Sequence, residues 1–164
     1  MKSTSFRRWR RCAAAPLAAI AAAILTGCPS SGDGSAEAFF PENYRTAFTL
    51  VRDCRNSIEH AATVRVWVNA IGAQAYLNDA NPLPVGTIVV KEQFSGAACD
   101  DDADLFLWSV MRKEEAGFDS QDGDWNWQDV SAPDRRVVVS GKTSCIGCHG
   151  RQECVERDYM CTAP

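Results

Sequence analysis

The spacing of apolar and polar residues changes several times along the chain. After Pro41, apolar residues recur at helical spacing, which predicts an amphipathic helix over residues 41–56. From Thr63 to Asn69 the pattern alternates, with three valines on one face and Arg65 on the other, which predicts a strand. A short helical piece is expected over residues 70–77, and the proline-rich stretch 81–84 predicts a turn or an extended loop.

Four further strands are predicted, at residues 85–94, 105–112, 125–130 and 135–139. An acidic loop at residues 100–104 and a Gly/Asp loop at residues 117–124 separate some of them. The acidic loop has no spacing of ligands that argues for calcium, so we expect it to be solvated. The predicted fold class is α+β, an antiparallel β-sheet with flanking short helices and a cysteine-rich C-terminal segment.

The N-terminal segment has the pattern of an export signal. Met1–Arg11 carries five basic residues and no acidic one, and the apolar run that follows, Ala13–Leu25, is too short to span a bilayer. The run ends in Leu25-Thr26-Gly27-Cys28, which resembles the bacterial lipobox, in which the cysteine is lipidated and becomes the first residue of the mature chain. An ordinary signal peptide with a chance cysteine is the alternative.

This pattern predicts three parts: residues 1–27 as a lipoprotein signal peptide, 28–39 as a flexible tether and 40–164 as one domain. Without residues 1–27 the chain keeps 12 of its 17 basic residues against 21 acidic ones, a formal charge of −9. Such a charge excludes nucleic acid as an electrostatic partner. We therefore expect an exported protein, held by a lipid anchor on a bacterial membrane and facing the periplasm.

One motif carries chemistry. Cys145-Ile146-Gly147-Cys148-His149 is the pattern of c-type haem attachment, and it predicts one covalent haem c and no other cofactor. Two thiols add to the two vinyl groups of the porphyrin, and the histidine that follows binds the iron axially. The C-terminal segment is therefore predicted to be a c-type haem-attachment segment.

Two other kinds of site fit part of the motif. A redox dithiol of the thioredoxin kind needs a preceding βαβ unit, which this chain lacks. A zinc site could use Cys145, Cys148, Cys154 and Cys161, but it ignores the adjacent His149. For the sixth position of the iron, the candidates are Met111, Met160 and His60, although a surface or capping role is the commoner fate of a lone histidine such as His60.

The remaining cysteines suggest disulfides, as expected for an exported chain. Cys54, Cys99, Cys154 and Cys161 allow three pairings, which the sequence does not separate. We favour Cys54–Cys99 and Cys154–Cys161. In a continuous helix, seven residues give about 10.5 Å of rise, which exceeds the Cα separation of a disulfide, about 7 Å at most. The second pairing therefore requires residues 150–161 to turn back.

The ordered motifs from Phe40 to Cys161 resemble the cytochrome P460 family, which includes the cytochromes c′-beta. The resemblance rests on short segments spread along the chain: Pro41-Glu42-Asn43-Tyr44-Arg45, Arg65 in its strand, Val85-Gly86-Thr87-Ile88-Val89-Val90-Lys91-Glu92, Asp124-Trp125-Asn126-Trp127, and the haem motif followed by Asp158-Tyr159. It implies a β-rich, usually dimeric fold with an open distal side on the haem. The additional cysteines, and the Met160-Cys161 ending where relatives commonly have an aromatic residue, depart from the family pattern.

The resemblance also assigns roles. In P460 proper, the strand lysine is cross-linked to a haem meso carbon and the enzyme oxidises hydroxylamine; Lys91 occupies that position here. In a regular strand the side chains of Lys91 and Glu92 point to opposite faces of the sheet. Glu92 should therefore not hold the lysine in its charged form. Arg65 matches the family's strand arginine, with ion pairing to a haem propionate as its expected role.

Three functions follow as hypotheses. The first is oxidation of hydroxylamine or a related small nitrogen species, with electrons leaving to a redox partner protein. The second is non-enzymatic binding of nitric oxide or carbon monoxide, as in the cytochromes c′-beta. The third is simple electron transfer.

Overall fold

The computed structural model describes residues 36–141 and 145–161. The predicted signal peptide, the lipidation site Cys28 and most of the tether lie outside the described residues. No helix in the described part is long and apolar enough to cross a membrane.

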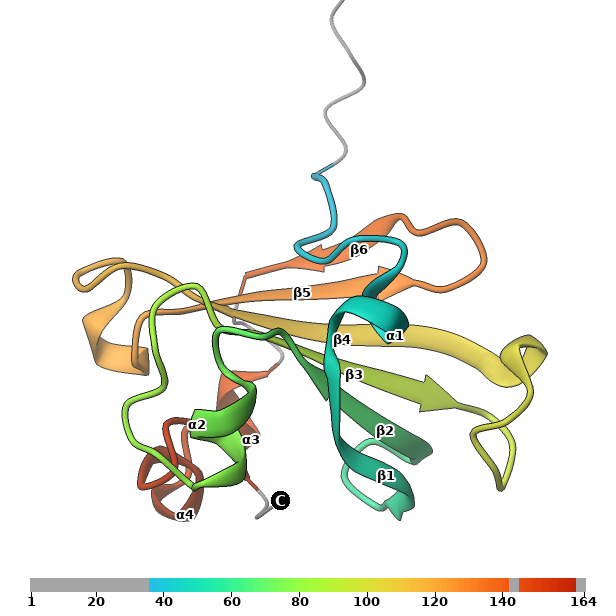
Figure 1. The fold of residues 1–164 in the computed structure, drawn as a ribbon, viewed down its shortest axis with the longest axis horizontal. Helices are drawn as coiled ribbons and strands as arrows, with labels where there is room; N and C mark the ends of the chain where they lie inside the picture. Colours follow the sequence, from blue (N-terminus) through green and yellow to red (C-terminus); the bar gives the residue numbers. More distant parts are fainter. Residues whose placement is uncertain (1–35, 142–144, 162–164) are drawn as a thin grey trace, which may run out of the picture. The chain divides into compact units, whose positions relative to one another are not determined.

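The domain is built on a six-stranded antiparallel meander, in which each strand pairs with its sequence neighbours (Figure 1). The strands are β1 (Thr49–Ser57), β2 (Ala62–Val68), β3 (Ile88–Phe94), β4 (Leu105–Lys113), β5 (Trp125–Ser131) and β6 (Val137–Ser140). Short helices complete it: α1 (Tyr44–Ala47), α2 (Ala73–Leu77), α3 (Ile146–His149) and α4 (Gln152–Val155), with 3-10 turns at Asp102–Asp104 and Ser120–Asp122. The α+β class and the antiparallel sheet are as predicted.

The predicted helix over residues 41–56 is wrong beyond Ala47. Only Tyr44–Ala47 is helical, and Thr49–Ser57 forms the edge strand β1, which pairs with β2 from Thr49–Val68 to Ser57–Ala62. Register shifts on either side of Arg52 interrupt the strict two-residue alternation of this strand, which explains why its pattern looks helical. Pairing with β2 supplies a sheet ladder that local propensity does not encode.

The pleat of β3 divides the core into two layers. Val89 belongs to one buried cluster, together with Val66 and Met111 from the flanking strands. Val90 and Phe94 belong to another, on the opposite face. We name these the lysine face and the glutamate face, because Lys91 and Glu92 point to them respectively.

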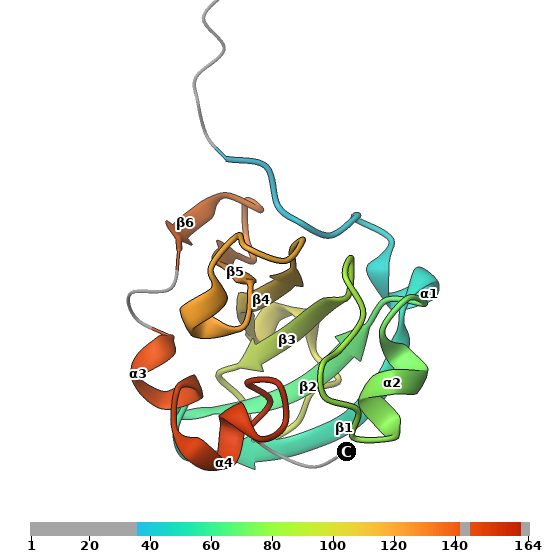
Figure 2. The ribbon, with the colours of Figure 1, turned by 90° about the vertical axis from the view of Figure 1, so that its left-hand side faces the viewer.

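On the lysine face, α3 and α4 lie close together beside the sheet (Figure 2), and the Asn81 side chain donates hydrogen bonds to the carbonyls of Val155 and Glu156. The segment after α2 therefore holds the C-terminal segment over this face. The aromatic residues of the N-terminal segment and α1 cover the glutamate face, where Phe40 and Tyr44 pack edge-on against Trp108.

Glu92 is the polar centre of the glutamate face. Its side chain is completely buried, yet it accepts hydrogen bonds from the Tyr44 hydroxyl, from Arg45 Nε at 2.5 Å and from Trp67 Nε1 at 3.0 Å. A buried carboxylate is tolerated only when its oxygens are satisfied in this way. Burial, followed by the hydrogen bond to Glu92, raises the pKa of Tyr44 far above its ordinary value, so this hydroxyl stays a donor.

The hydrogen bonds of Glu92 lead to the first prediction. Glu92→Gln should lower the free energy of unfolding by about 3 kcal/mol, since it leaves buried donors without a charged acceptor. Urea denaturation measures the change. Asp102→Asn is the matched control, because Asp102 pairs with the same Arg45 but its side chain is 73% exposed; it should cost less than about 1 kcal/mol. Equal losses would show that Glu92 is not the centre of this network.

Candidate functional site

The Cys-x-x-Cys-His motif forms a single helical turn. The backbone N–H groups of Cys148 and His149 donate to the carbonyl of Cys145 at 3.2 and 3.0 Å. Cys145 and Ile146 pack against the core of the lysine face, whereas Cys148 is exposed. Because residues four apart share a face of a helix, Cys145 and His149 both lie on the side of α3 that meets the sheet.

His149 is held in one orientation. Its Nδ1 lies 2.7 Å from the backbone carbonyl of Tyr159, and its ring packs edge-on against Trp127 with centroids 5.1 Å apart. Burial lowers the pKa of His149, partly opposed by the hydrogen bond to Tyr159. A neutral imidazole that donates from Nδ1 keeps a lone pair on Nε2, the arrangement that an axial metal ligand needs.

The loop that supplies the Tyr159 carbonyl is tightly fixed. A disulfide joins Cys154 and Cys161 at its two ends. Asp158 and Tyr159 both adopt left-handed conformations, with φ of 51° and 69°, which residues other than glycine rarely adopt. The buried Asp158 carboxylate accepts from Lys113 Nζ at 2.7 Å and from the Leu83 N–H at 2.8 Å. These contacts stabilise an otherwise unfavourable backbone and aim the carbonyl at His149.

Gly123 allows this loop to approach the sheet. A Cβ on Gly123 would lie 2.3 Å from Cε2 of the Tyr159 ring, and its φ of +68° also favours glycine. The Tyr159 hydroxyl donates to the Gln121 carbonyl at 3.0 Å in the same turn. The loop before β5 therefore takes part in positioning His149.

Lys91 lies on the same face as the motif. It pairs in register with Val66 on one side and Ser109 on the other, in the middle of the sheet. Its Nζ is 2.8 Å from Nε2 of His60, which comes from the turn between β1 and β2. The expectation that Glu92 points away from Lys91 holds, because its hydrogen bonds with Tyr44, Arg45 and Trp67 lie on the glutamate face.

The electrostatic environment favours neutral nitrogen bases here. Burial, followed by the positive charge of Arg52, lowers the pKa of Lys91 to about 8. Burial and the charge of Lys91 lower the pKa of His60 to about 4, so His60 is neutral at physiological pH. Lys91 can therefore donate a hydrogen bond to His60 and lose its proton close to neutrality.

The structure places Arg65 on the glutamate face. Its guanidinium donates to the Cys99 carbonyl at 2.5 Å and lies over the Phe94 ring on the glutamate face, away from Lys91. It therefore does not belong to the site that holds Cys145 and His149. The strand arginine on the lysine face is Arg52, which pairs in register with Val66; its position in an irregular strand hid it from the sequence pattern.

The four other cysteines pair as favoured from the sequence. Disulfides join Cys54 with Cys99 and Cys154 with Cys161, and Cys145 and Cys148 remain thiols. A zinc site built from Cys145, Cys148, Cys154 and Cys161 is incompatible with the second disulfide, since disulfide sulfur is not the thiolate that zinc binds.

These residues fit a c-type haem. The Cys145 thiol and an oriented imidazole lie against an apolar face that includes Val66 and Met111, and the Cys148 thiol is exposed on the same helical turn. The indole N–H of Trp127, beside His149, is buried and has no hydrogen-bond partner in the described part of the chain. Met160 and Met111 also belong to this buried cluster. His60 is within hydrogen-bond distance of Lys91, whose side chain lies on the same face of the sheet.

The comparison with known families decides the class of protein. The family model for cytochrome P460 matches residues 41–162. The chain belongs to the cytochrome P460 family. It is thus a c-type cytochrome of the P460 and c′-beta kind, a class of haem-iron proteins. No curated protein matches the chain.

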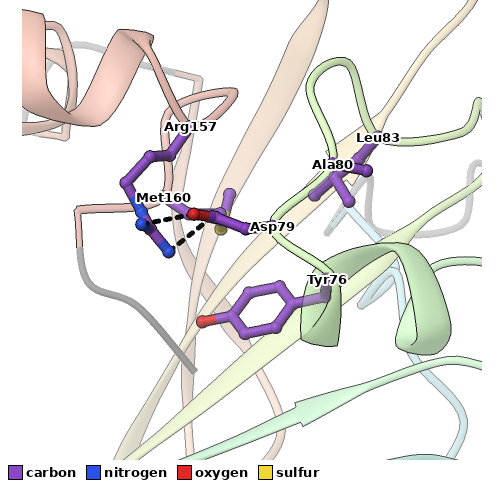
Figure 3. A pocket seen from close by; sticks show the side chains of 6 residues that line it. All are labelled: Tyr76, Asp79, Ala80, Leu83, Arg157 and Met160. Carbon is purple, nitrogen blue, oxygen red and sulfur yellow. Dashed lines mark hydrogen bonds and ion pairs between the residues drawn. The ribbon is translucent and has the colours of Figure 1, made fainter.

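A small pocket at Met160 does not include the Cys-x-x-Cys-His motif or Lys91. Tyr76, Leu83 and Met160 line it, together with the ion pair between Arg157 and Asp79 (Figure 3). With a volume of about 10 Å³ it has room for one water molecule at most. The ion pair joins the C-terminal loop to the segment after α2, so this region supports the loop that holds His149.

The disulfides give the second prediction. The chain-entropy model of disulfide stabilisation predicts a loss of about 4 kcal/mol for Cys54→Ala/Cys99→Ala and about 2.5 kcal/mol for Cys154→Ala/Cys161→Ala. Chemical denaturation of the holoprotein measures both. Only the second variant should also change the iron–histidine stretching frequency in resonance Raman spectra, because only that disulfide closes the loop that contacts His149. An unchanged frequency would show that the loop holds its position without the disulfide.

Proposed function

We propose that this protein is a periplasmic-side mono-haem c-type cytochrome of P460 type that oxidises hydroxylamine or a related small nitrogen species at an open distal iron site. The observation that carries the proposal is Lys91, whose amino group lies on the face of the sheet that receives the Cys-x-x-Cys-His motif. Membership of the family supports it, because the equivalent strand lysine of P460 proper is the residue cross-linked to haem.

Attachment follows from the motif. The Cys145 and Cys148 thiols would hold the haem by adding across its two vinyl groups, each sulfur gaining a bond to carbon while its proton passes to the neighbouring carbon. No oxidant would be needed for this addition. His149 would offer Nε2 to the iron, since its Nδ1 is engaged by the Tyr159 carbonyl. The haem, when bound, supplies the redox chemistry, and the protein supplies orientation and proton transfer.

The reaction requires both electron and proton acceptors. Conversion of hydroxylamine to nitric oxide releases three electrons and three protons. A redox partner protein takes the electrons one at a time, and water takes the protons. His60 is a hydrogen-bond acceptor here and only a weak base, because burial and the charge of Lys91 lower its pKa to about 4.

The bond between Lys91 and haem requires an oxidant of its own. A bond between Lys91 Nζ and a meso carbon replaces one N–H and one C–H, so two protons and two electrons leave. A peroxide is the class of oxidant that accepts both pairs, and hydrogen peroxide then becomes two water molecules. The reacting amine must be neutral, which the lowered pKa of Lys91, about 8, favours.

The apolar lining of the lysine face favours a second candidate. Val66, Val89 and Met111 are buried there, a setting suited to a small uncharged ligand. The alternative function is therefore non-enzymatic binding of nitric oxide or carbon monoxide, as in the cytochromes c′-beta. Simple electron transfer is the third candidate, with Met111 or Met160 as the source of a sixth ligand.

The location and partners are also part of the proposal. The N-terminal pattern ending in Cys28 supports an exported, lipid-anchored protein on a bacterial membrane, and the excess of acidic residues supports a redox partner with a basic surface. The family resemblance supports a homodimer. The location, the redox partner and the homodimer are each independent of the reaction at the haem.

The third prediction tests the reaction. Wild-type holoprotein should oxidise hydroxylamine with an artificial electron acceptor, and its haem peptide should contain Lys91 as well as Cys145 and Cys148. Lys91→Ala should keep haem bound through both cysteines and lose at least nine-tenths of the turnover. Turnover assays and mass spectrometry of the haem peptide measure these outcomes.

Lys113→Ala is a suitable control for loss of a buried lysine, because Lys113 pairs with Asp158 and does not contact Lys91. It should lower stability and leave the Lys91 link in place. A wild-type haem peptide with only the two cysteines, and no turnover, would favour the gas-binding function. A ligand-inert, six-coordinate spectrum would favour electron transfer.

The fourth prediction concerns the anchor. Cys28→Ala should release the protein into the soluble periplasmic fraction with its haem intact, since lipidation requires the cysteine thiol. Membrane fractionation, with mass spectrometry of the mature N-terminus, tests this. A soluble wild type whose mature chain does not begin at Cys28 would contradict the lipobox.

A further inference from the structure

His60 has an unusual position for a residue in a tight turn. It lies between β1 and β2, where the Ala61 N–H donates to the Ile58 carbonyl and Ala61 adopts a φ of 48°. Ile58, in the same turn, is 84% exposed. The imidazole of His60, in contrast, is half-buried and points back over the lysine face. The turn therefore places one polar side chain beside Lys91 on the lysine face.

That side chain meets Lys91. The 2.8 Å between His60 Nε2 and Lys91 Nζ is a hydrogen-bond distance, and it joins residues that are 31 positions apart in the sequence. A lysine in the middle of a strand, flanked by Val66 and Ser109, has a long flexible stem and no carboxylate hydrogen-bonded to its amino group among the described residues. Without His60, Nζ would lose this hydrogen bond, which fixes its direction.

The charged groups around this pair act at longer range. Arg52 from β1 disfavours the ammonium form of Lys91, whereas Cys145, Glu59 and Asp129 favour it. The carboxylate of Asp129 accepts a hydrogen bond from Ser109 Oγ at 2.6 Å. His149 belongs to the same environment, because its charge would disfavour protonation of His60.

We propose that His60 is the positioning residue for Lys91: it accepts a hydrogen bond from the lysine amino group and holds Nζ on the lysine face, where the haem motif lies. The proposal rests on the proposed function, since it gives the pair a task in forming the bond between Lys91 and haem. In that bond formation, the N–H proton, the C–H proton and two electrons pass to the peroxide, which becomes two water molecules.

The experiment compares haem peptides from four holoproteins: wild type, His60→Leu, His60→Gln and Ile58→Ala. Leucine has no acceptor, glutamine keeps one, and Ile58 is an uncharged residue of the same turn that is 84% exposed. Mass spectrometry measures the fraction of haem linked to Lys91, and the pyridine haemochrome assay confirms attachment through Cys145 and Cys148. We expect at least a tenfold lower linked fraction in His60→Leu, a smaller loss in His60→Gln and none in Ile58→Ala.

A second measurement separates this inference from the proposed function. Crystal structures of the wild-type and His60→Leu holoproteins report where Lys91 Nζ lies, whether or not it is linked. If the wild type carries no link, the cross-link is refuted, and the inference about positioning then requires Nζ beside His60 in the wild type and displaced in His60→Leu. A linked fraction in His60→Leu equal to that of the wild type, or a wild-type His60 turned out of the pocket, would overturn the role of His60.

Discussion

The pleat of β3 is the constraint on which the rest of the structure depends. Adjacent residues of a strand point to opposite faces, so the carboxylate of Glu92 cannot reach the amino group of Lys91. Glu92 is instead neutralised on its own face by Arg45 and satisfied by Tyr44 and Trp67. Had both side chains shared a face, they would have formed an ion pair and kept the lysine charged. The separation leaves a lysine whose amino group is accessible to chemistry.

The lysine face of the sheet is completed by segments far apart in sequence. The turn before β2 contributes His60, β3 contributes Lys91, and the C-terminal loop contributes the carbonyl that orients His149. The loop is held by a disulfide and by the buried ion pair of Asp158 with Lys113. The geometry of the site therefore depends on these supporting contacts. Small changes in the residues that orient a metal ligand can have large effects on the site.

One sequence prediction failed, and another residue lies on a face of the sheet that the sequence left open. The helix predicted over residues 41–56 ends at Ala47, because β1 gains a ladder of hydrogen bonds with β2 that no local window contains. Arg65 lies on the glutamate face, where Cys99 and Phe94 occupy its guanidinium. Strand alternation did place the Arg65 side chain on the other face of the sheet from its neighbouring valines. It could not show which of the two faces would receive the haem motif.

Spacing along one segment was enough to predict the haem motif, the antiparallel strands from β2 to β6, and the opposite directions of the Lys91 and Glu92 side chains. It could not predict that His60 meets Lys91, that Arg52 lies on the lysine face, or that Tyr159 orients His149, all of which depend on the folded structure. These contacts depend on turn geometry, a bulged edge strand and left-handed backbone at Asp158 and Tyr159. The physical reason is that packing between distant segments selects among local conformations that the sequence leaves nearly equal in energy.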